Sequence, residues 1–350
     1  MSKKSKVLTA MSLMLAISAF TGCSSANGKA ASEKSETGAS VTNTENKETK
    51  TDAEPLKVVC TIFPEYDWTK EILGSHAENV DISYLLDSGI DLHNYQPTAD
   101  DIMKISTCDL FVYVGGESDE WVEDALENAV NKDMKVINLM DALGDFAKAE
   151  ELKEGMQGEE EEESEEEDED EIEYDEHVWL SLKNAKVLCT EIESGLETID
   201  PANAADYKSN LASYVSELDE LDSSFKALVD GASVKTLIFA DRFPFRYFVD
   251  DYGLDYFAAF IGCSAESEAS FETIKFLSDK VKELDCDNVY ILENSNKDIA
   301  NAVISSSGKS GVKIAELNSL QSVSQNDIKD GASYISLMQK NYDVLSGTLK

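Results

Sequence analysis

The chain has 350 residues, of which 70 are Asp or Glu and 30 are Lys or Arg, so its formal net charge is −40 at pH 7. A charge of this size repels nucleic acid and anionic lipid, which excludes both as partners of the folded part. Without its polar N-terminal segment the chain keeps about 295 residues, a length that suits two domains of ordinary size.

A secretory signal peptide is predicted at residues 1–22. Lys3, Lys4 and Lys6 form a short basic segment, and residues 7–20 are almost wholly apolar. An apolar run of this length is too short to span a bilayer as a stable helix. No later stretch reaches ~18 consecutive apolar residues, so we expect that the mature chain does not cross the membrane.

The signal ends at Phe20-Thr21-Gly22-Cys23, which resembles the lipobox of bacterial lipoproteins, with Phe20 in place of the usual Leu or Val. The resemblance implies cleavage before Cys23 and a lipid on its sulfur; an ordinary signal peptide with an incidental cysteine is the alternative. Residues 23–56 are polar and contain no aromatic side chain. Because such a segment cannot bury enough apolar surface to offset chain entropy, we predict a lipidated, disordered tether to the membrane.

An N-terminal α/β lobe is predicted at residues 57–149. Short runs rich in Val, Ile, Phe and Tyr alternate with segments of helical periodicity. This alternation implies a parallel sheet with helices on both faces. The predicted strands are 57–62, 80–85, 110–114 and 135–139, and the predicted helices are 67–73, 99–106 and 119–131.

Residues 150–176 are dominated by Glu and Asp and form an acidic segment. Like charges at this density extend a chain, so a disordered acidic loop is predicted. Its field would attract cations, although a solubilising insert is the simpler interpretation. The N-terminal lobe is expected to end with residues 177–199.

One long linking helix is predicted at residues 200–231. Asp200 can cap it, Pro201 suits its first turn, and apolar residues follow at spacings of three and four up to Leu228. A C-terminal lobe at 232–350 then repeats the first plan, with strands at 235–240, 255–260, 288–292 and 312–317 and helices at 244–250, 270–284, 297–305 and 333–345. We therefore predict two α/β lobes, with mainly parallel four-stranded sheets, joined by one rigid α-helix.

The chain contains three histidines: His76, His93 and His177. His76 lies in a turn and is expected to be solvated. His93 and His177 lie in loops expected at the carboxyl ends of strands, where ligands gather in open α/β sheets. A divalent metal site that joins these two imidazoles is therefore the leading interpretation of the sequence.

The loops that hold these two histidines resemble the ligand motifs of the solute-binding lipoproteins of zinc and manganese ABC importers. His93-Asn94-Tyr95-Gln96-Pro97-Thr98 is similar to the first motif, and Asp175-Glu176-His177-Val178-Trp179-Leu180 is similar to the second. The resemblance covers residues 57–350, including the linking helix. In zinc-specific members a variable loop, often rich in histidine, precedes the second ligand, and here the acidic loop takes that place.

The chain departs from this family at two further ligand positions. Arg242 occupies the third position, and because a guanidinium has no lone pair to offer, Asp241 is the expected substitute. Asn318 aligns with the fourth position, and Glu293, at the end of the preceding strand, is the alternative. The predicted metal ligands are His93, His177 and Asp241, with water or Glu293 completing the set.

The resemblance implies a binding protein that delivers Zn²⁺ to the membrane permease of an ABC importer, with Mn²⁺ or iron as the alternative ion. A surface adhesin of the same fold and a binding protein for a chelated metal are further alternatives. A zinc hydrolase is disfavoured because the sequence offers two credible histidines and no H-E-x-x-H helix. We therefore expect no catalysis.

The cysteines beyond Cys23 are odd in number, so at least one thiol must be free. Apolar neighbours indicate that three of them are buried core thiols. A disulfide is conceivable between Cys263 and Cys286 alone.

Overall fold

The structure is a computed structural model that describes residues 54–158, 173–264 and 268–349. The predicted signal peptide, the lipidation site at Cys23 and nearly all of the tether lie outside the described residues, as do residues 159–172 of the acidic segment. Among the described residues, none of the helices is both long and apolar enough to cross a bilayer.

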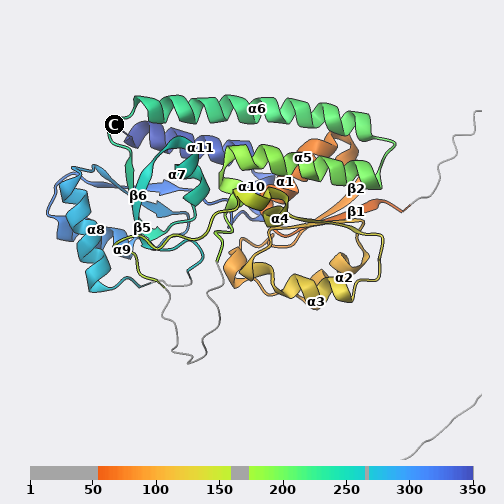
Figure 1. The fold of residues 1–350 in the computed structure, drawn as a ribbon, viewed down its shortest axis with the longest axis horizontal. Helices are drawn as coiled ribbons and strands as arrows, with labels where there is room; N and C mark the ends of the chain where they lie inside the picture. The colour runs from red at the N-terminus through yellow and green to blue at the C-terminus, as the bar shows by residue number, and fades with distance from the viewer. Residues whose placement is uncertain (1–53, 159–172, 265–267, 350) are drawn as a thin grey trace, which may run out of the picture. The chain divides into compact units, whose positions relative to one another are not determined.

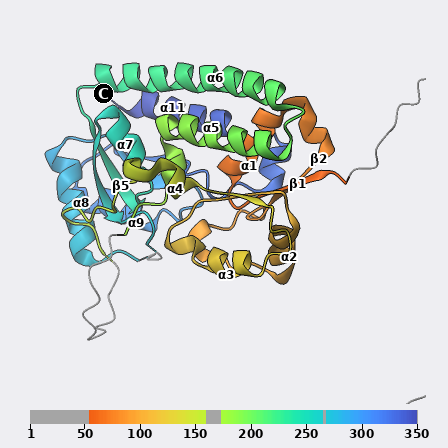
Figure 2. The ribbon, with the colours of Figure 1, turned by 45° about the vertical axis from the view of Figure 1, so that its right-hand side comes forward.

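The N-terminal lobe is built on a four-stranded parallel sheet with the strand order β2-β1-β3-β4. Helices cover both of its faces, with α1 and α5 on one side and α2 and α3 on the other (Figures 1 and 2). The strands are β1 Leu56–Cys60, β2 Val80–Tyr84, β3 Leu110–Tyr113 and β4 Lys135–Asn138, and the helices are α1 Phe63–Leu73, α2 Ala99–Thr107, α3 Trp121–Glu127, α4 Leu139–Leu143 and α5 Leu182–Ile199.

The C-terminal lobe contains a second four-stranded parallel sheet with the order β6-β5-β7-β8. Helices α8 and α9 pack on one face, while α7 and α11 contact the other (Figure 1). The strands are β5 Thr236–Arg242, β6 Asp255–Phe260, β7 Asn288–Leu292 and β8 Lys313–Leu317, and the helices are α7 Arg246–Tyr252, α8 Phe271–Glu283, α9 Asp298–Ser307, α10 Gln325–Lys329 and α11 Tyr334–Thr348. These elements confirm the predicted fold class.

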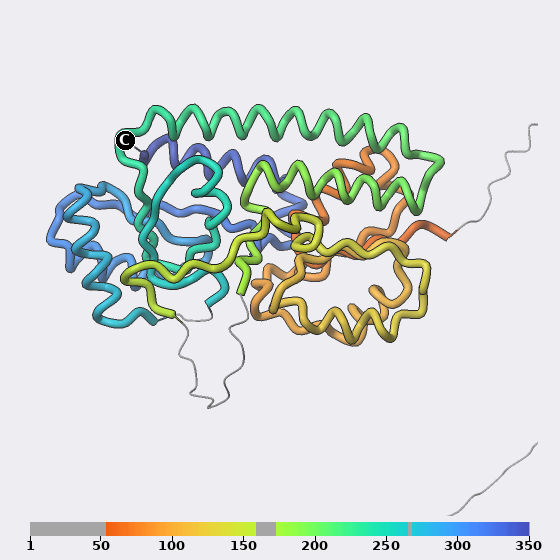
Figure 3. Tube along the Cα trace, in the orientation of Figure 1, coloured from red at the N-terminus to blue at the C-terminus, as the bar shows by residue number. Residues whose placement is uncertain are grey.

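The linking helix α6, Ala204–Gly231, runs along both lobes (Figure 3). It packs on α1 and α5 of the first lobe and on α7 and α11 of the second. Its start is later than predicted, because Asp200 ends α5 and the N-cap of α6 is Asn203. Pro201 therefore lies in the turn between the two helices.

One apolar core continues from lobe to lobe. A single cluster of buried side chains includes Val112 of the first sheet, Leu218 of α6 and Leu317 of the second sheet. Separating the lobes would expose this shared core to water, which is unfavourable at about 25 cal/mol per Å² of apolar surface. The fold therefore favours a fixed relation between the lobes.

The two described ends of the acidic segment pair with each other. The backbone N–H of Glu150 donates to the carbonyl of Glu173 at 2.9 Å, and Ala149 and Tyr174 form an antiparallel bridge. The predicted disorder from residue 150 is therefore wrong for residues 150–158 and 173–176, which the structure places against the lobes.

Asp67 is an acidic side chain inside the core. It is 7 % exposed, and its Oδ2 accepts the backbone N–H of Tyr334 at 2.8 Å. Burial raises the pKa of this carboxyl to about 7. The pKa of this carboxyl is higher in the folded chain than in the unfolded chain. Below about pH 4 the carboxyl is protonated in both states and does not lower the free energy of unfolding. As the pH rises to about 7, the unfolded chain ionises more readily, so the free energy of unfolding falls.

We expect Asp67→Asn to raise the free energy of unfolding by about 2–4 kcal/mol at pH 8, because the amide oxygen still accepts from Tyr334 while the buried charge is removed. At pH 4 the variant and the native chain are expected to be equally stable. Urea denaturation at the two pH values measures the difference. Asp230→Asn, at an exposed position of α6, is the matched control, and an equal gain at pH 4 would contradict the prediction.

Candidate metal centre

His93 lies in a short 3₁₀ turn, Leu92–Asn94, that follows β2 and leads to α2. Asp91 caps this turn by accepting the backbone N–H of His93 at 3.1 Å. On the ring, Nδ1 lies 2.8 Å from Oγ of Ser118 and 3.6 Å from Oε2 of Glu176. These contacts hold Nδ1 and leave Nε2 facing the loop that carries His177.

His177 is fully buried at the start of the turn Val178–Leu180, where the acidic segment rejoins the fold. Asp175 accepts its backbone N–H at 2.8 Å and also lies 3.0 Å from its Nδ1. Because an ionised carboxylate can only accept, Nδ1 carries the proton and Nε2 keeps its lone pair. A carboxylate behind a histidine is the arrangement that orients metal-binding imidazoles.

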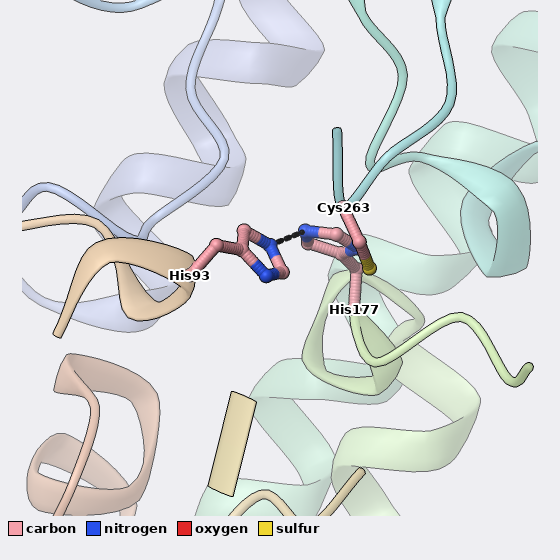
Figure 4. Close-up of side chains that lie close together, drawn as sticks. All are labelled: His93, His177 and Cys263. Carbon is pink, nitrogen blue, oxygen red and sulfur yellow. Dashed lines mark hydrogen bonds between the residues drawn. The ribbon is translucent and has the colours of Figure 1, made fainter. Parts of the chain in front are cut away.

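The two imidazoles meet at their Nε2 atoms, which lie 3.2 Å apart (Figure 4). Two nitrogens that are each ~2.0–2.1 Å from a tetrahedral zinc ion lie about 3.3–3.4 Å apart. The observed separation therefore fits a zinc ion bound by both rings. The structure thus brings together the two histidines that the sequence predicts as ligands.

Cys263 is the third potential ligand, and it comes from the C-terminal lobe. It follows β6 and points toward His177 (Figure 4). One donor atom each from Cys263, His93 and His177 lie within 4.8 Å of one another. A Cβ on Gly262 would lie 3.0 Å from Cε1 of His177, so the glycine permits this close approach.

The surroundings of His93 favour its neutral imidazole, the form that can bind a metal ion, at neutral pH. Burial, together with the neighbouring His177, lowers the pKa of His93 to about 3. Burial, with Asp175 and Glu150 nearby, raises the pKa of the Cys263 thiol. A coordinating metal ion deprotonates such a thiol, so the thiolate forms when the ion binds.

Arg242 is not a donor to this site but supports it. Its Nη2 contacts Oδ2 of Asp91 at 2.5 Å, and its Nη1 lies 3.4 Å from the carbonyl of Ser264. Although burial alone would raise the pKa of Asp91, Arg242 and His93 hold it below its ordinary value. The guanidinium therefore links an ionised carboxylate beside His93 to the loop that carries Cys263.

Asp241 and Glu293, which the sequence suggests as further ligands, are engaged elsewhere. Asp241 accepts the backbone N–H groups of Arg242 at 2.9 Å and Leu292 at 3.2 Å, and so joins β5 to β7 at a bulge. Glu293 accepts the N–H of Ser319 at 2.7 Å and its hydroxyl at 2.6 Å. Neither residue belongs to the His93 group among the described residues.

The structure also bears on two further residues or pairs that the sequence analysis singled out, Asn318 and the pair Cys263 and Cys286. Asn318 turns its Oδ1 to the backbone N–H of Leu320 at 2.8 Å, so its amide oxygen caps a turn. The disulfide considered between Cys263 and Cys286 is wrong, because both residues are thiols. Cys263 lies with the histidines, whereas Cys286 is buried in a separate core cluster of the second lobe.

A cavity of about 250 Å³ opens beside His93 and Cys263. Among the described residues, four glutamates and no Lys or Arg line it, so its field attracts cations toward the donor atoms. Three of the glutamates, Glu150, Glu173 and Glu176, belong to the ordered ends of the acidic segment. The lining residues are His93, Glu117, Ser118, Glu150, Glu173, Tyr174, Glu176, Ile261 and Cys263.

Sequence reasoning did not place Cys263 with the histidines, although a signal was present. Ile261-Gly262-Cys263 follows a buried strand of the second sheet, at its carboxyl end. The histidine loops were expected at the same kind of position in the first lobe. The thiol was considered for a disulfide, because no local motif identifies a single cysteine as a ligand.

Comparison with known proteins gives the family. The sequence profile described as "Zinc-uptake complex component A periplasmic" matches residues 58–347. The zinc-binding lipoprotein AdcA of Streptococcus pneumoniae is 32% identical over 293 residues, covering 84% of this chain and 56% of AdcA. This chain therefore spans little more than half the length of that relative. The high-affinity zinc uptake system protein ZnuA of Bacillus subtilis is 31% identical over 294 residues, covering 84% of this chain and 88% of ZnuA.

Solved structures agree with this assignment. The Zn(II)-bound ZnuA-like domain of Streptococcus pneumoniae AdcA superimposes with a TM-score of 0.65 at 29% identity, covering 84% of this chain and 99% of that domain. The metal-dependent lipoprotein YcdH of Bacillus subtilis gives a TM-score of 0.67 at 27% identity, with 84% and 99% coverage. The fold, the paired histidine loops and the profile match together show that this chain belongs to the family of the zinc-uptake complex component A.

Proposed function

We propose that this protein is an extracytoplasmic solute-binding protein that captures Zn²⁺ between its lobes and delivers it to the permease of an ABC importer. His93, His177 and Cys263 are the proposed ligands. The observation that supports this proposal most directly is the 3.2 Å distance between the Nε2 atoms of His93 and His177, with the thiol of Cys263 in the same cluster. Asp241 and Glu293 are not retained as ligands, because their oxygens already accept hydrogen bonds.

The donor chemistry supports zinc over the alternative ions. Thiolate with imidazole is a soft to intermediate donor set that suits Zn²⁺, whereas Mn²⁺ prefers carboxylates, carbonyls and water. The relatives described above carry zinc in their names, which supports the same choice. In this proposal zinc is the cargo and not a catalytic ion, because the profile that the chain matches describes a component of zinc uptake.

Anchoring and delivery complete the proposal. A lipid on Cys23 would hold the protein at the outer face of the cell membrane, and the segment up to residue 56 would serve as the tether. The glutamate-lined cavity would guide the ion inward, since a pocket of one sign of charge raises the local concentration of counter-ions.

Titration of the metal-free mature protein with Zn²⁺, Mn²⁺, Fe²⁺ and Ni²⁺ tests the proposal. We expect one tight equivalent of Zn²⁺ and weaker binding of Mn²⁺. Isothermal titration calorimetry in a competing chelator gives stoichiometry and affinity together. Several weak, salt-sensitive equivalents without a tight one would mean that the acidic residues, and not the histidine cluster, hold the metal.

Cys263→Ser is expected to raise the Kd for Zn²⁺ about 100-fold, or about 2.8 kcal/mol, because a thiolate donor is replaced by a neutral hydroxyl. The Co²⁺ complex of the native protein should show a near-ultraviolet thiolate-to-cobalt charge-transfer band, and the variant should lack it. Cys286→Ser is the control, since this thiol lies in the core of the second lobe. Retention of the band in the Cys263 variant would remove Cys263 from the ligand set.

A further inference from the structure

Residues 147–158, which we call the strap, leave the first lobe after α4 and cross to the second lobe (Figure 3). The strap ends against β6, the edge strand of the second sheet. There the backbone N–H of Gln157 donates to the carbonyl of Ala259 at 2.9 Å, and Gln157 forms a parallel bridge with Phe260. Its side-chain oxygen accepts the backbone N–H of Ser270, the N-cap of α8, at 2.9 Å. A segment that follows the first sheet in the chain thus pairs with the edge of the second.

Two close contacts hold the middle of the strap on the second lobe. Gly155 has a φ of +85°, and a Cβ at this position would lie 2.1 Å from Cδ1 of Phe276 on α8. Glycine therefore permits both the left-handed backbone and the close approach. The ammonium of Lys153 pairs with Asp255 and lies 4.2 Å from the centre of the Tyr256 ring, at the start of β6. None of these side chains belongs to the donor cluster of the proposed metal site.

The first part of the strap contacts the loop that carries Cys263. Oε1 of Glu150 accepts the backbone N–H of Cys263 at 3.3 Å, and the backbone N–H of Glu150 is itself paired with the carbonyl of Glu173. Cys263 lies between β6 and α8 and belongs to neither, so this side chain supplies an acceptor that regular structure does not. The direction in which the thiol leaves the backbone therefore depends on where the strap places Glu150.

We infer that the strap positions the thiol: held on β6 and α8, it places Glu150 so that the backbone of Cys263 is fixed and its side chain faces His93 and His177. Glu150 is in this assignment a positioning residue and not a ligand, because its carboxylate lies outside the donor cluster. The inference rests on the proposed function, in which Cys263 binds the ion. It makes the affinity of the site depend on a segment of the chain that does not touch the ion.

Gly155→Ala tests the strap without altering the metal site. The added methyl would overlap Phe276 and strain the left-handed backbone, so the strap is expected to shift away from α8. We expect the Kd for Zn²⁺ to rise about 10-fold, the cost typical of a lost supporting contact at a metal site. In the metal-free protein, alkylation of Cys263 by iodoacetamide, located by mass spectrometry, should become about fivefold faster, because a loop that is no longer held exposes its thiol more often. Gly308→Ala is the matched control, since its φ is +66° but no atom lies within 4 Å of the added Cβ.

Glu150→Gln and Glu150→Ala separate positioning from charge. The glutamine keeps an acceptor oxygen for the N–H of Cys263 and should retain near-native Zn²⁺ affinity and alkylation rate, whereas the alanine variant should reproduce both changes of Gly155→Ala. Glu154→Ala, at an exposed glutamate of the strap, is the matched control. If Glu150 acted only through its negative charge in the cavity, glutamine and alanine would weaken Zn²⁺ binding equally, and that result would overturn the positioning role.

Thermal melting of the metal-free variants confirms that each one is folded before its affinity is measured. A lower melting temperature in Gly155→Ala with native Zn²⁺ affinity and a native alkylation rate would assign the strap to stability alone and overturn the inference. Failure of the native protein to bind Zn²⁺ would instead refute the proposed function. The alkylation rates are measured without metal, so they report separately whether the strap holds Cys263 in place.

Discussion

The His93→Ala, His177→Ala double variant is expected to lose the tight equivalent of Zn²⁺, with a Kd at least ~1,000-fold higher, or about 4 kcal/mol. Both Nε2 atoms that face each other at 3.2 Å are removed, and a thiol without imidazole partners cannot hold the ion. Calorimetric titration with a competing chelator measures the change. Weak binding by exposed carboxylates should remain, and it should weaken further as salt is added.

His76→Ala is the matched control for this variant. His76 is the third histidine of the chain, and its Nε2 contacts Asp206 of α6 at 2.9 Å. Its loss is expected to leave Zn²⁺ affinity unchanged. Tight, stoichiometric binding that survived in the double variant would show that the ion is held elsewhere in the chain.

Trp179→Ala is expected to lower the free energy of unfolding by about 3–5 kcal/mol, because a fully buried indole is deleted from the core. Its Nε1 donates to the carbonyl of Ser319 at 2.8 Å, and its own carbonyl accepts from the Tyr334 hydroxyl at 2.6 Å. The residue therefore connects the histidine loop of the first lobe to the second. Urea denaturation of the metal-free protein measures the loss.

Trp179→Phe separates packing from hydrogen bonding at the same position. The smaller ring keeps most of the apolar contact and leaves the Ser319 carbonyl without its donor, so a loss of about 1–3 kcal/mol is expected. The ring of Trp179 also lies 5.2 Å from that of His177, so the alanine variant should bind Zn²⁺ less tightly as well. Native stability in the alanine variant would contradict the assignment of Trp179 as a connection between the lobes.

The alternation of strands and helices was predictable because it follows from apolar periodicity, and each of the eight strands lies within two residues of its predicted bounds. The start of α1 was not predictable. Phe63-Pro64 was expected to precede the helix, yet α1 begins there because the buried carboxylate of Glu65 accepts the backbone N–H groups of Thr61 and Ile62. Such a cap depends on three-dimensional burial that periodicity does not encode.

The candidate site divides in the same way. His93 and His177 were predictable, because each lies in a distinctive motif of its own. Cys263 was not, since its proximity to the histidines arises only when β6 is placed beside the first lobe. Asp241 lies outside the histidine cluster for a physical reason, namely that a bulge in β5 leaves backbone N–H groups that its carboxylate satisfies.

The apolar core shared by the two lobes, with α6 packed along both, determines how loading of the site can be recognised. A rotation of one lobe away from the other would expose that core to water. The metal-bound and metal-free forms of the protein are therefore expected to have nearly the same arrangement of lobes. Under the proposed function, a permease that accepts only the loaded protein would then have to contact the loops that carry His93, His177 and Cys263. Recognition would then depend on the local conformation of these loops and not on an opening or closing of the two lobes.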